Sequence, residues 1–182
     1  MLRILFISFI FLVTGFLFLQ GRIKEENPEK PIFLRVDEIA EAHQTEIKTT
    51  IHSIYKPDSF QLEMLKKDYS NIWAHLNHLY NTNDVEVGKE YFTEDWFKQI
   101  CLHYKGTVEP TISRTDEEHN LHIQNWAWDG LVCTAIDSNV IFKYQLPNCF
   151  IKKTKANIAV VLLIQGDHWR IDAIRIIDEK NI

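Results

Sequence analysis

The pattern of apolar positions along the chain is strongest between residues 58 and 80, where it repeats at helical spacing. Asp58 and Ser59 come first, and both are residue types that cap helix N-termini. The apolar stripe that follows consists of Leu62, Leu65, Tyr69, Ile72, Trp73, Leu76, Leu79 and Tyr80. This stripe predicts a long amphipathic helix. A similar stripe over residues 36–55 predicts an earlier helix, which Pro57 ends.

A third helix is predicted to begin at Thr93. Threonine is a good capping residue, and the acidic Glu94 and Asp95 that follow it complement the positive end of a helix dipole. Gly106 marks the predicted end of this helix, because glycine readily adopts the left-handed conformation that often terminates helices.

After residue 106 the apolar positions change from helical to extended spacing. Residues 126–136 and 140–146 flank the turn-forming Asp137-Ser138-Asn139, so they predict a β-hairpin. Residues 158–164 carry aliphatic side chains on both faces, which is typical of a central strand. The pair Gly166-Asp167 predicts a tight turn into a final strand over residues 168–177. Helices followed by antiparallel strands predict an α+β fold, with the N-terminal helices packed on a curved antiparallel sheet.

Residues 1–22 differ in composition from the rest of the chain and predict a hydrophobic export leader. A single early cation, Arg3, precedes an uncharged run over residues 4–19 that holds five of the 11 phenylalanines. This run is slightly longer than a signal-peptide core of roughly 7–15 residues and slightly shorter than a membrane span of roughly 20. Two interpretations therefore stay open, a cleaved signal peptide and a retained N-terminal membrane anchor. Both predict export to the periplasm or cell envelope, with membrane contact only through residues 1–22.

The remainder of the chain divides into a tether and a domain. Residues 23–35 are charged and contain two prolines, which indicates a solvated tether. Residues 36–182 have a length suited to a single α+β domain. The whole chain has 20 cationic and 25 acidic residues, and removing residues 1–22 leaves 18 cations against 25 acids, a net charge of −7. Such an acidic domain disfavours nucleic acid as a partner.

Sequence motifs for cofactors and metals are absent or incomplete. The chain has no GxGxxG, GxxxxGK[ST], GxSxG, CxxC or HExxH pattern, so we expect no cofactor. The pair His75/His78 would need further metal ligands from elsewhere in the chain. His119/His122 is the better metal candidate because residues 116–122 also supply carboxylates, but short acidic loops of this kind are usually only solvated, and we predict no metal. The three cysteines, Cys101, Cys133 and Cys149, allow at most one intramolecular disulfide, and we favour buried free thiols.

The order of elements and two short segments resemble a known superfamily. The segments are Tyr-Phe-Thr-Glu-Asp-Trp at residues 91–96 and Gly-Asp-His-Trp-Arg-Ile-Asp-Ala-Ile at residues 166–174. Over residues 60–178 the chain resembles the nuclear-transport-factor-like (SnoaL-like) cone-fold superfamily, which includes ketosteroid isomerase, scytalone dehydratase and exported bacterial domains of no known activity. The resemblance implies a pocket between a concave sheet and the helices, and a homodimer formed through the sheet. It transfers no catalytic residue to this chain.

A candidate ligand pocket is predicted from the last strand. Arg175 is the only charge in the same-face row formed by Trp169, Ile171, Ala173, Arg175 and Ile177. If that row faces the interior, the guanidinium needs a partner, and Asp129 is the expected one. Trp126 and Trp128 would then form the walls of a site for a small polar ligand. The alternative is that Arg175 lies at the sheet edge with its charged head in water.

Three functional hypotheses follow from these features. The leading one is an exported cell-envelope domain that binds a small-molecule ligand or a protein without catalysis. The second is a small-molecule isomerase, dehydratase or hydrolase, with Asp129 or Asp172 as the general base and His168 or His103 as the acid. The third is an immunity or assembly protein that docks a partner through its acidic surface.

Overall fold

Three α-helices and six β-strands make up the part of the chain that the computed structural model describes, which is residues 30–43, 45–104, 112–146 and 150–182. The predicted leader, most of the tether, Gly106 and Cys149 lie outside these residues. Ile32–Ile182 form one compact unit. Its helical elements are α2 (Ile32–Ala42), α3 (Ser59–Thr82), the short 3-10 helix η1 (Lys89–Tyr91) and α4 (Glu94–His103). Its strands are β1 (Ile47–Ile51), β2 (Ser113–Asp116), β3 (His119–Trp126), β4 (Val132–Gln145), β5 (Ile151–Gln165) and β6 (His168–Asn181).

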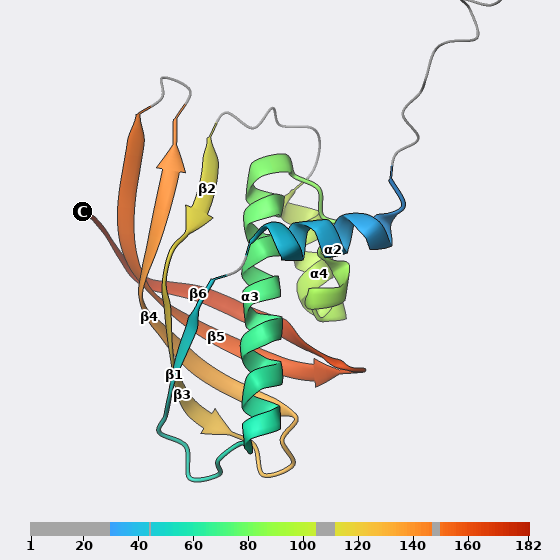
Figure 1. Ribbon diagram of the computed structural model, residues 1–182, viewed down its shortest axis with the longest axis vertical. Coiled ribbons are helices and arrows are strands. Elements are labelled where there is room, and N and C mark those ends of the chain that lie inside the picture. The colour runs from blue at the N-terminus through green and yellow to red at the C-terminus, as the bar shows by residue number, and fades with distance from the viewer. Residues whose placement is uncertain (1–29, 44, 105–111, 147–149) are drawn as a thin grey trace, which may run out of the picture. The chain divides into compact units, whose positions relative to one another are not determined.

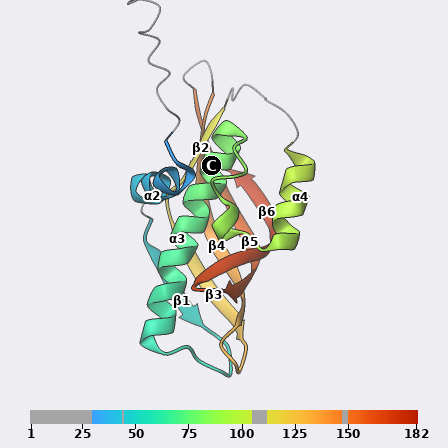
Figure 2. The same cartoon turned by 90° about the vertical axis from the view of Figure 1, so that its right-hand side faces the viewer.

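The six strands form one open, curved sheet in the order β1-β3-β4-β5-β6, with β2 pairing with one end of β4. Figure 1 shows the long strands curving around α3, which lies along the concave side of the sheet. Figure 2 shows α2 and α4 on opposite sides of α3. The predicted α+β class, with helices on a curved sheet, is therefore confirmed. The sheet is not wholly antiparallel, because β1 runs parallel to β3.

Helix α3 is the central element of the core, and its predicted position is confirmed. Asp58 caps its N-terminus: the Asp58 carboxylate accepts a hydrogen bond from the Gln61 backbone N–H at 2.7 Å, and the Gln61 side chain accepts one from Asp58 N–H at 3.0 Å. This reciprocal capping box satisfies two N–H groups that a helix end leaves unpaired. The apolar stripe is buried against the sheet, where Tyr69 and Trp73 are its largest side chains.

The predicted helix over residues 36–55 is wrong in its second half. Helix α2 ends at Ala42, and residues 47–51 form the strand β1. Four of these five residues are β-branched, with isoleucine at each end and two threonines between them, and such side chains favour the extended conformation. Pairing with β3 buries Ile47 to 7% exposure. The tertiary contact therefore overrides the helical periodicity.

The predicted hairpin at Asp137-Ser138-Asn139 is also wrong, because β4 runs through this segment without turning. Ser138 and Asn139 instead form a β-bulge opposite Asn157 of β5, and Asn139 has a positive φ of 60°. The hairpin that joins β3 to β4 turns earlier, at residues 127–131, where Gly130 has a φ of 74°. Asparagine and glycine suit these positions because both tolerate left-handed backbone.

The tight turn predicted at Gly166-Asp167 is confirmed. Gln165 pairs with His168 across it, and Gly166 adopts a φ of 73°. The predicted central strand is also confirmed, since β5 lies between β4 and β6 and buries Ile158, Val160 and Leu162. Among the described residues, no helix is both long enough and apolar enough to cross a membrane.

Candidate functional site

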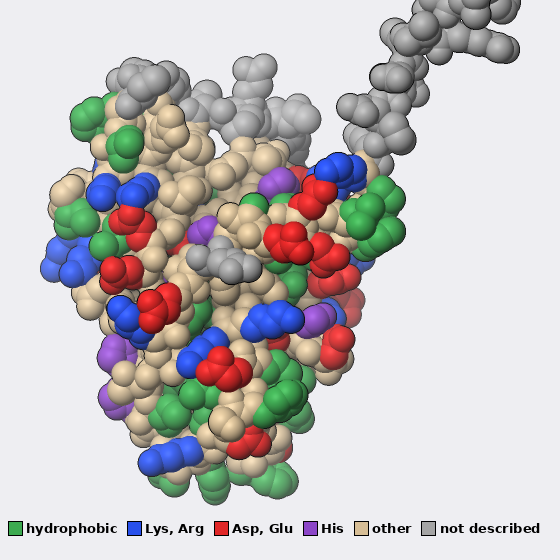
Figure 3. Space-filling view, in the orientation of Figure 1, with side chains coloured by type: hydrophobic (Ala, Val, Ile, Leu, Met, Phe, Trp, Pro, Cys, Tyr) green, Lys and Arg blue, Asp and Glu red, His purple; other side chains and the backbone are tan. Residues whose placement is uncertain are grey.

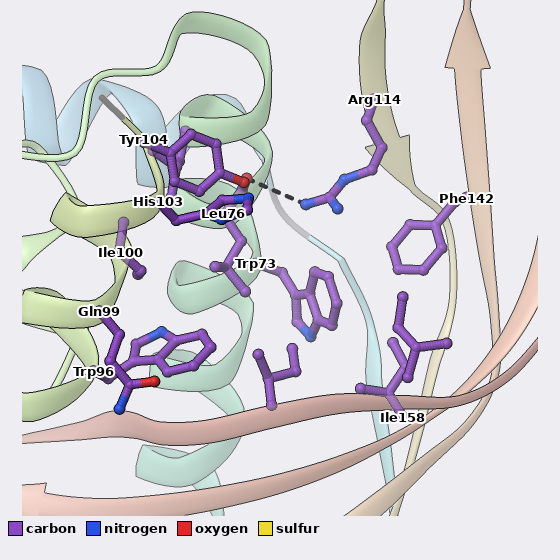
Figure 4. Close-up of a pocket in the computed structure, with 13 residues that line it drawn as sticks. Trp73, Leu76, Trp96, Gln99, Ile100, His103, Tyr104, Arg114, Phe142 and Ile158 are labelled. Atoms are coloured by element: carbon purple, nitrogen blue, oxygen red, sulfur yellow. Dashed lines mark hydrogen bonds between the residues drawn. The ribbon is translucent and has the colours of Figure 1, made fainter. Parts of the chain in front are cut away.

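A cavity of about 480 Å³ lies between the concave face of the sheet and helices α3 and α4. Its volume is within the range of roughly 300–1,000 Å³ that is usual for small-molecule sites. Figure 4 shows the side chains that enclose it. They are Trp73, Leu76, Leu79, Trp96, Gln99, Ile100, His103, Tyr104, Arg114, Phe142, Ile158, Ile174 and Ile176. Most of this lining is apolar.

Strand β6 contributes to the cavity because a β-bulge changes which of its side chains face inward. Ile171 pairs with Leu162 and Ala173 pairs with Val161, so Asp172 has no partner on β5. A single extra residue reverses the alternation of faces along the rest of a strand. Ile171 is fully buried before the bulge, and after it Ile174 and Ile176 line the cavity.

Helix α4 forms the opposite wall and is attached to β6 at the same bulge. The Thr93 hydroxyl caps α4 by accepting a hydrogen bond from Trp96 N–H, and it donates one to the Asp172 carboxylate at 2.8 Å. The Thr93 N–H also donates to the Ile171 carbonyl at 3.0 Å. This attachment directs Trp96 of α4 into the cavity, while Gln99 and His103 form an exposed rim.

Arg114 of β2 brings a positive charge into this otherwise apolar space. Its Nε–H donates to Asn77 Oδ1 at 2.9 Å and its Nη2 donates to the Leu76 carbonyl at 3.2 Å, the contact dashed in Figure 4. The guanidinium carbon lies 4.6 Å from the ring centre of Tyr80 and 5.2 Å from that of Phe142. Burial lowers the pKa of Arg114, yet arginine remains charged in proteins. Among the described residues, no carboxylate forms an ion pair with it.

Two tryptophan N–H groups lie at the cavity, and one of them lacks a hydrogen-bond acceptor. The Nε1 atoms of Trp73 and Trp96 are both buried; the Trp73 indole interacts with the Tyr69 hydroxyl, whereas Trp96 Nε1 has no hydrogen-bond partner in the described part of the chain. Both side chains line the cavity. Because an unsatisfied buried donor costs roughly 1–3 kcal/mol, such groups are few in native proteins and point to a missing acceptor.

A buried polar network lies behind the cavity and connects to Arg114 through Asn77. Asn77 accepts from Arg114 and donates to Asp116 Oδ1. Asp116 Oδ2 lies 2.8 Å from His119 Nε2, and Asp137 Oδ2 lies 2.5 Å from His119 Nδ1. The Tyr69 hydroxyl completes the chain by donating to Asp137 at 2.8 Å. These contacts satisfy the polar atoms of a cluster that has little access to water.

The charge of His119 is set by its two carboxylate neighbours. Burial on its own lowers the pKa of His119, but hydrogen bonds to Asp116 and Asp137 outweigh burial and raise this pKa to about 9. Burial on its own raises the pKa of Asp116, yet hydrogen bonds from His119 and His43 hold it well below its usual range. His119 is therefore a cation at neutral pH, and it donates both ring N–H groups.

The two histidine pairs considered as metal ligands have other roles. His119 is enclosed by carboxylates, whereas His122 stacks on His52 with ring centres 5.5 Å apart. His75 is buried against Tyr91, with its Nδ1 2.7 Å from the Asn71 carbonyl. The described residues contain no group of three or more His, Cys, Asp or Glu side chains placed to hold a metal ion.

The four residues of the predicted pocket do not meet in one site. Trp126 is buried with its ring centre 5.0 Å from that of Trp169. Trp128 is 81% exposed, and Asp129 is an exposed turn residue that accepts a hydrogen bond from Leu131 N–H. Arg175 is exposed on β6, and no ion pair or hydrogen bond joins it to Asp129 among the described residues. The bulge at Asp172 is the reason, because it reverses the face that Arg175 was expected to occupy.

A second hollow of about 580 Å³ lies among α2, α3, η1 and the start of β6. Its lining is mainly polar and carries five carboxylates, from Asp37, Glu41, Glu63, Asp68 and Glu90. Figure 3 shows acidic side chains gathered over α2. His168 lines this hollow rather than the apolar cavity.

The two described cysteines are free thiols. Cys133 is buried, and burial raises its pKa to about 12, so the thiol does not ionise at neutral pH. Cys101 is half-buried in α4. The third cysteine, Cys149, lies outside the described residues.

Comparison of the chain with models of protein families, with curated proteins and with solved structures gives no match.

Proposed function

We propose that the chain is a binding module whose cavity takes up a small hydrophobic molecule without transforming it. The observation that carries this proposal is the apolar cavity between α3, α4 and the concave sheet. An open apolar cavity costs the folded protein the contacts that packed side chains would make there. A bound molecule would restore those contacts, which is the physical basis for expecting an occupant.

The placement of candidate acid–base groups favours binding over catalysis. Asp129 lies in an exposed turn, and Asp172 accepts the Thr93 hydroxyl proton at the base of α4. Only His103, among the histidines and aspartates proposed for catalysis, lines the cavity. General acid–base catalysis needs both groups within hydrogen-bond reach of one substrate. The isomerase, dehydratase or hydrolase hypothesis therefore has weaker support.

We also propose that the fold is of the cone type and that the domain is exported to the cell envelope. The position of the cavity, between helices and a concave sheet, agrees with what the resemblance to the cone-fold superfamily implies. The proposed location is supported by the sequence of residues 1–22.

A neutral fluorescent probe such as 1-aminoanthracene tests whether the cavity binds. We expect saturable binding to the wild-type chain. Ile176→Trp places an indole at the cavity and should weaken binding about tenfold or more, since overpacking costs roughly 1–3 kcal/mol. Ile177→Trp is a matched control, because Ile177 is 55% exposed, compared with 50% for Ile176, and does not line the cavity. Equal affinities for the two variants would refute the proposed binding site.

A further inference from the structure

We propose, on the basis of the binding function above, that the natural ligand is a hydrophobic monocarboxylate whose carboxylate pairs with Arg114. The ligand's apolar part would fill the cavity between α3, α4 and β6. This chemistry follows from three features of the cavity, which are an incompletely paired cation, a neighbouring carboxylate that is already occupied, and a mainly apolar lining with an unpaired N–H donor.

The first feature is the state of the Arg114 guanidinium. An arginine side chain has five N–H donors. Arg114 uses one of them toward Asn77 and one toward the Leu76 carbonyl, which leaves three without a protein acceptor among the described residues. Aromatic rings cover its faces but supply no counter-charge. A buried guanidinium is costly unless an anion meets it, and a carboxylate matches its planar fork.

The second feature is that the nearest buried carboxylate is already occupied. Asp116 accepts from Asn77 through Oδ1 and has three partners at Oδ2, namely His43, Thr45 and His119. Asn77 lies between Asp116 and Arg114 and bonds to both. The Asp116 charge is therefore directed to His119, and the open side of Arg114 remains for a ligand.

The third feature is the rest of the lining. The unpaired indole donor of Trp96 favours a ligand with acceptor oxygens, because a ligand with donors alone would leave it unsatisfied. The remaining walls are aliphatic or aromatic, including Leu79, Ile158 and Ile174, and the polar Gln99 and His103 lie at the exposed rim. A single arginine in such surroundings suits a monoanion with a hydrophobic body better than a doubly charged phosphate ester.

The test compares three ligands of one chain length, decanoate, 1-decanol and decyl phosphate, as competitors of 1-aminoanthracene at pH 7. We expect decanoate to bind about tenfold to hundredfold more tightly than decanol. This difference in affinity corresponds to the roughly 1.5–3 kcal/mol that one hydrogen bond to a charged group contributes. Decyl phosphate should bind more weakly than decanoate. Arg114→Met should abolish the preference for decanoate while decanol affinity changes little. Arg175→Met is the matched control and should keep the preference, because Arg175 is an exposed residue outside the cavity.

The outcomes separate this inference from the proposed function. If the probe and all three ligands fail to bind the wild-type chain, the proposed function fails. If decanol binds as tightly as decanoate, or decyl phosphate binds best, the cavity binds ligands but the carboxylate inference is overturned. Arg114→Lys provides a second variant should Arg114→Met not fold. Lysine keeps the charge but loses the planar fork, so the preference should shrink and not vanish, and an unchanged preference would count against Arg114.

Discussion

His119 carries a positive charge in the core, where ion pairs with Asp116 and Asp137 stabilise it. Its side chain is fully buried, so each of its ring nitrogens depends on a carboxylate for stabilisation. Trp73 lies against the imidazole, with ring centres 5.0 Å apart, and the same indole lines the cavity. Protonated His119, held by its two carboxylates, therefore packs behind Trp73, which forms part of the cavity wall.

We predict that the free energy of unfolding falls as pH rises from about 6.5 to 9. The pKa of His119 is about 9 in the folded state and 6.5 in the unfolded state, so the folded state binds more protons in this interval. The stabilisation is complete below pH 6.5 and is lost as pH passes 9, and it amounts to on the order of 3 kcal/mol. Urea denaturation at pH 6 and pH 9 measures it.

His119→Asn should be less stable than the wild type at pH 6 and should lose this pH dependence. The exposed His52→Asn should keep it, and this variant is the control for general effects of removing a histidine. Burial lowers the pKa of His75 and of His78, which opposes this trend near pH 6, so the comparison between variants is decisive. A His119→Asn chain with the same pH dependence as the wild type would contradict the assignment of a cationic His119.

At the scale of elements, the junction between α4 and β6 determines the shape of the cavity. One residue, Thr93, caps the helix and also binds the bulged Asp172 of the strand. The cap fixes where α4 begins, and the bulge fixes which side chains of β6 face it. The Thr93–Asp172 hydrogen bond therefore couples the start of α4 to the bulge that decides which β6 side chains face inward.

Thr93→Val tests this junction, because valine has the shape of threonine without the hydroxyl. We expect a loss of about 1–2 kcal/mol in the free energy of unfolding from the lost cap, together with weaker binding of the neutral probe. Thr93→Ser retains the hydroxyl and should preserve most of the stability and most of the affinity for the probe. Equal stability of the valine and serine variants, measured by urea denaturation, would show that the hydroxyl contacts do not hold α4 in place.

Elements with strong local signals could be predicted from the sequence, and those set by distant contacts could not. The capped stripe of α3 and the Gly166-Asp167 turn depend on neighbouring residues, and both were predicted correctly. Strand β1 depends on pairing with β3, and the Asp137 segment looks like a turn but is held in β4 by Tyr69 and His119.

The resemblance implied a pocket between the helices and a concave sheet, but the residues that line the cavity were not predicted, for a related reason. A strict alternation along β6 places Arg175 inward, but the bulge at Asp172 places Ile174 there instead. Arg114 follows no recognisable motif, and its role arises from the meeting of β2 with α3. Local signals did predict two walls of the cavity, because the stripe of α3 includes Trp73 and Leu76 and the Thr93 cap marks the start of α4.

At the scale of the whole molecule, the proposed location depends on residues 1–22. We predict that the full chain, expressed in a bacterium, is recovered in the cell-envelope fraction. Residues 23–182 expressed alone should stay in the cytosol. The physical reason is the uncharged, phenylalanine-rich run after Arg3. Mass spectrometry of the recovered chain separates cleavage from retention as an anchor. Recovery of the full chain in the cytosol would contradict export.

The parallel pairing of β1 with β3 constrains the order in which the molecule can fold. Helices α3 and α4 and strand β2 all lie between these two strands in the chain. Closing so long a loop costs chain entropy before any contact compensates for it. The hairpins of β3 to β6 and the helix α3 need shorter closures. The edge strand β1, although it comes first in the sequence, is therefore expected to join the sheet last during folding.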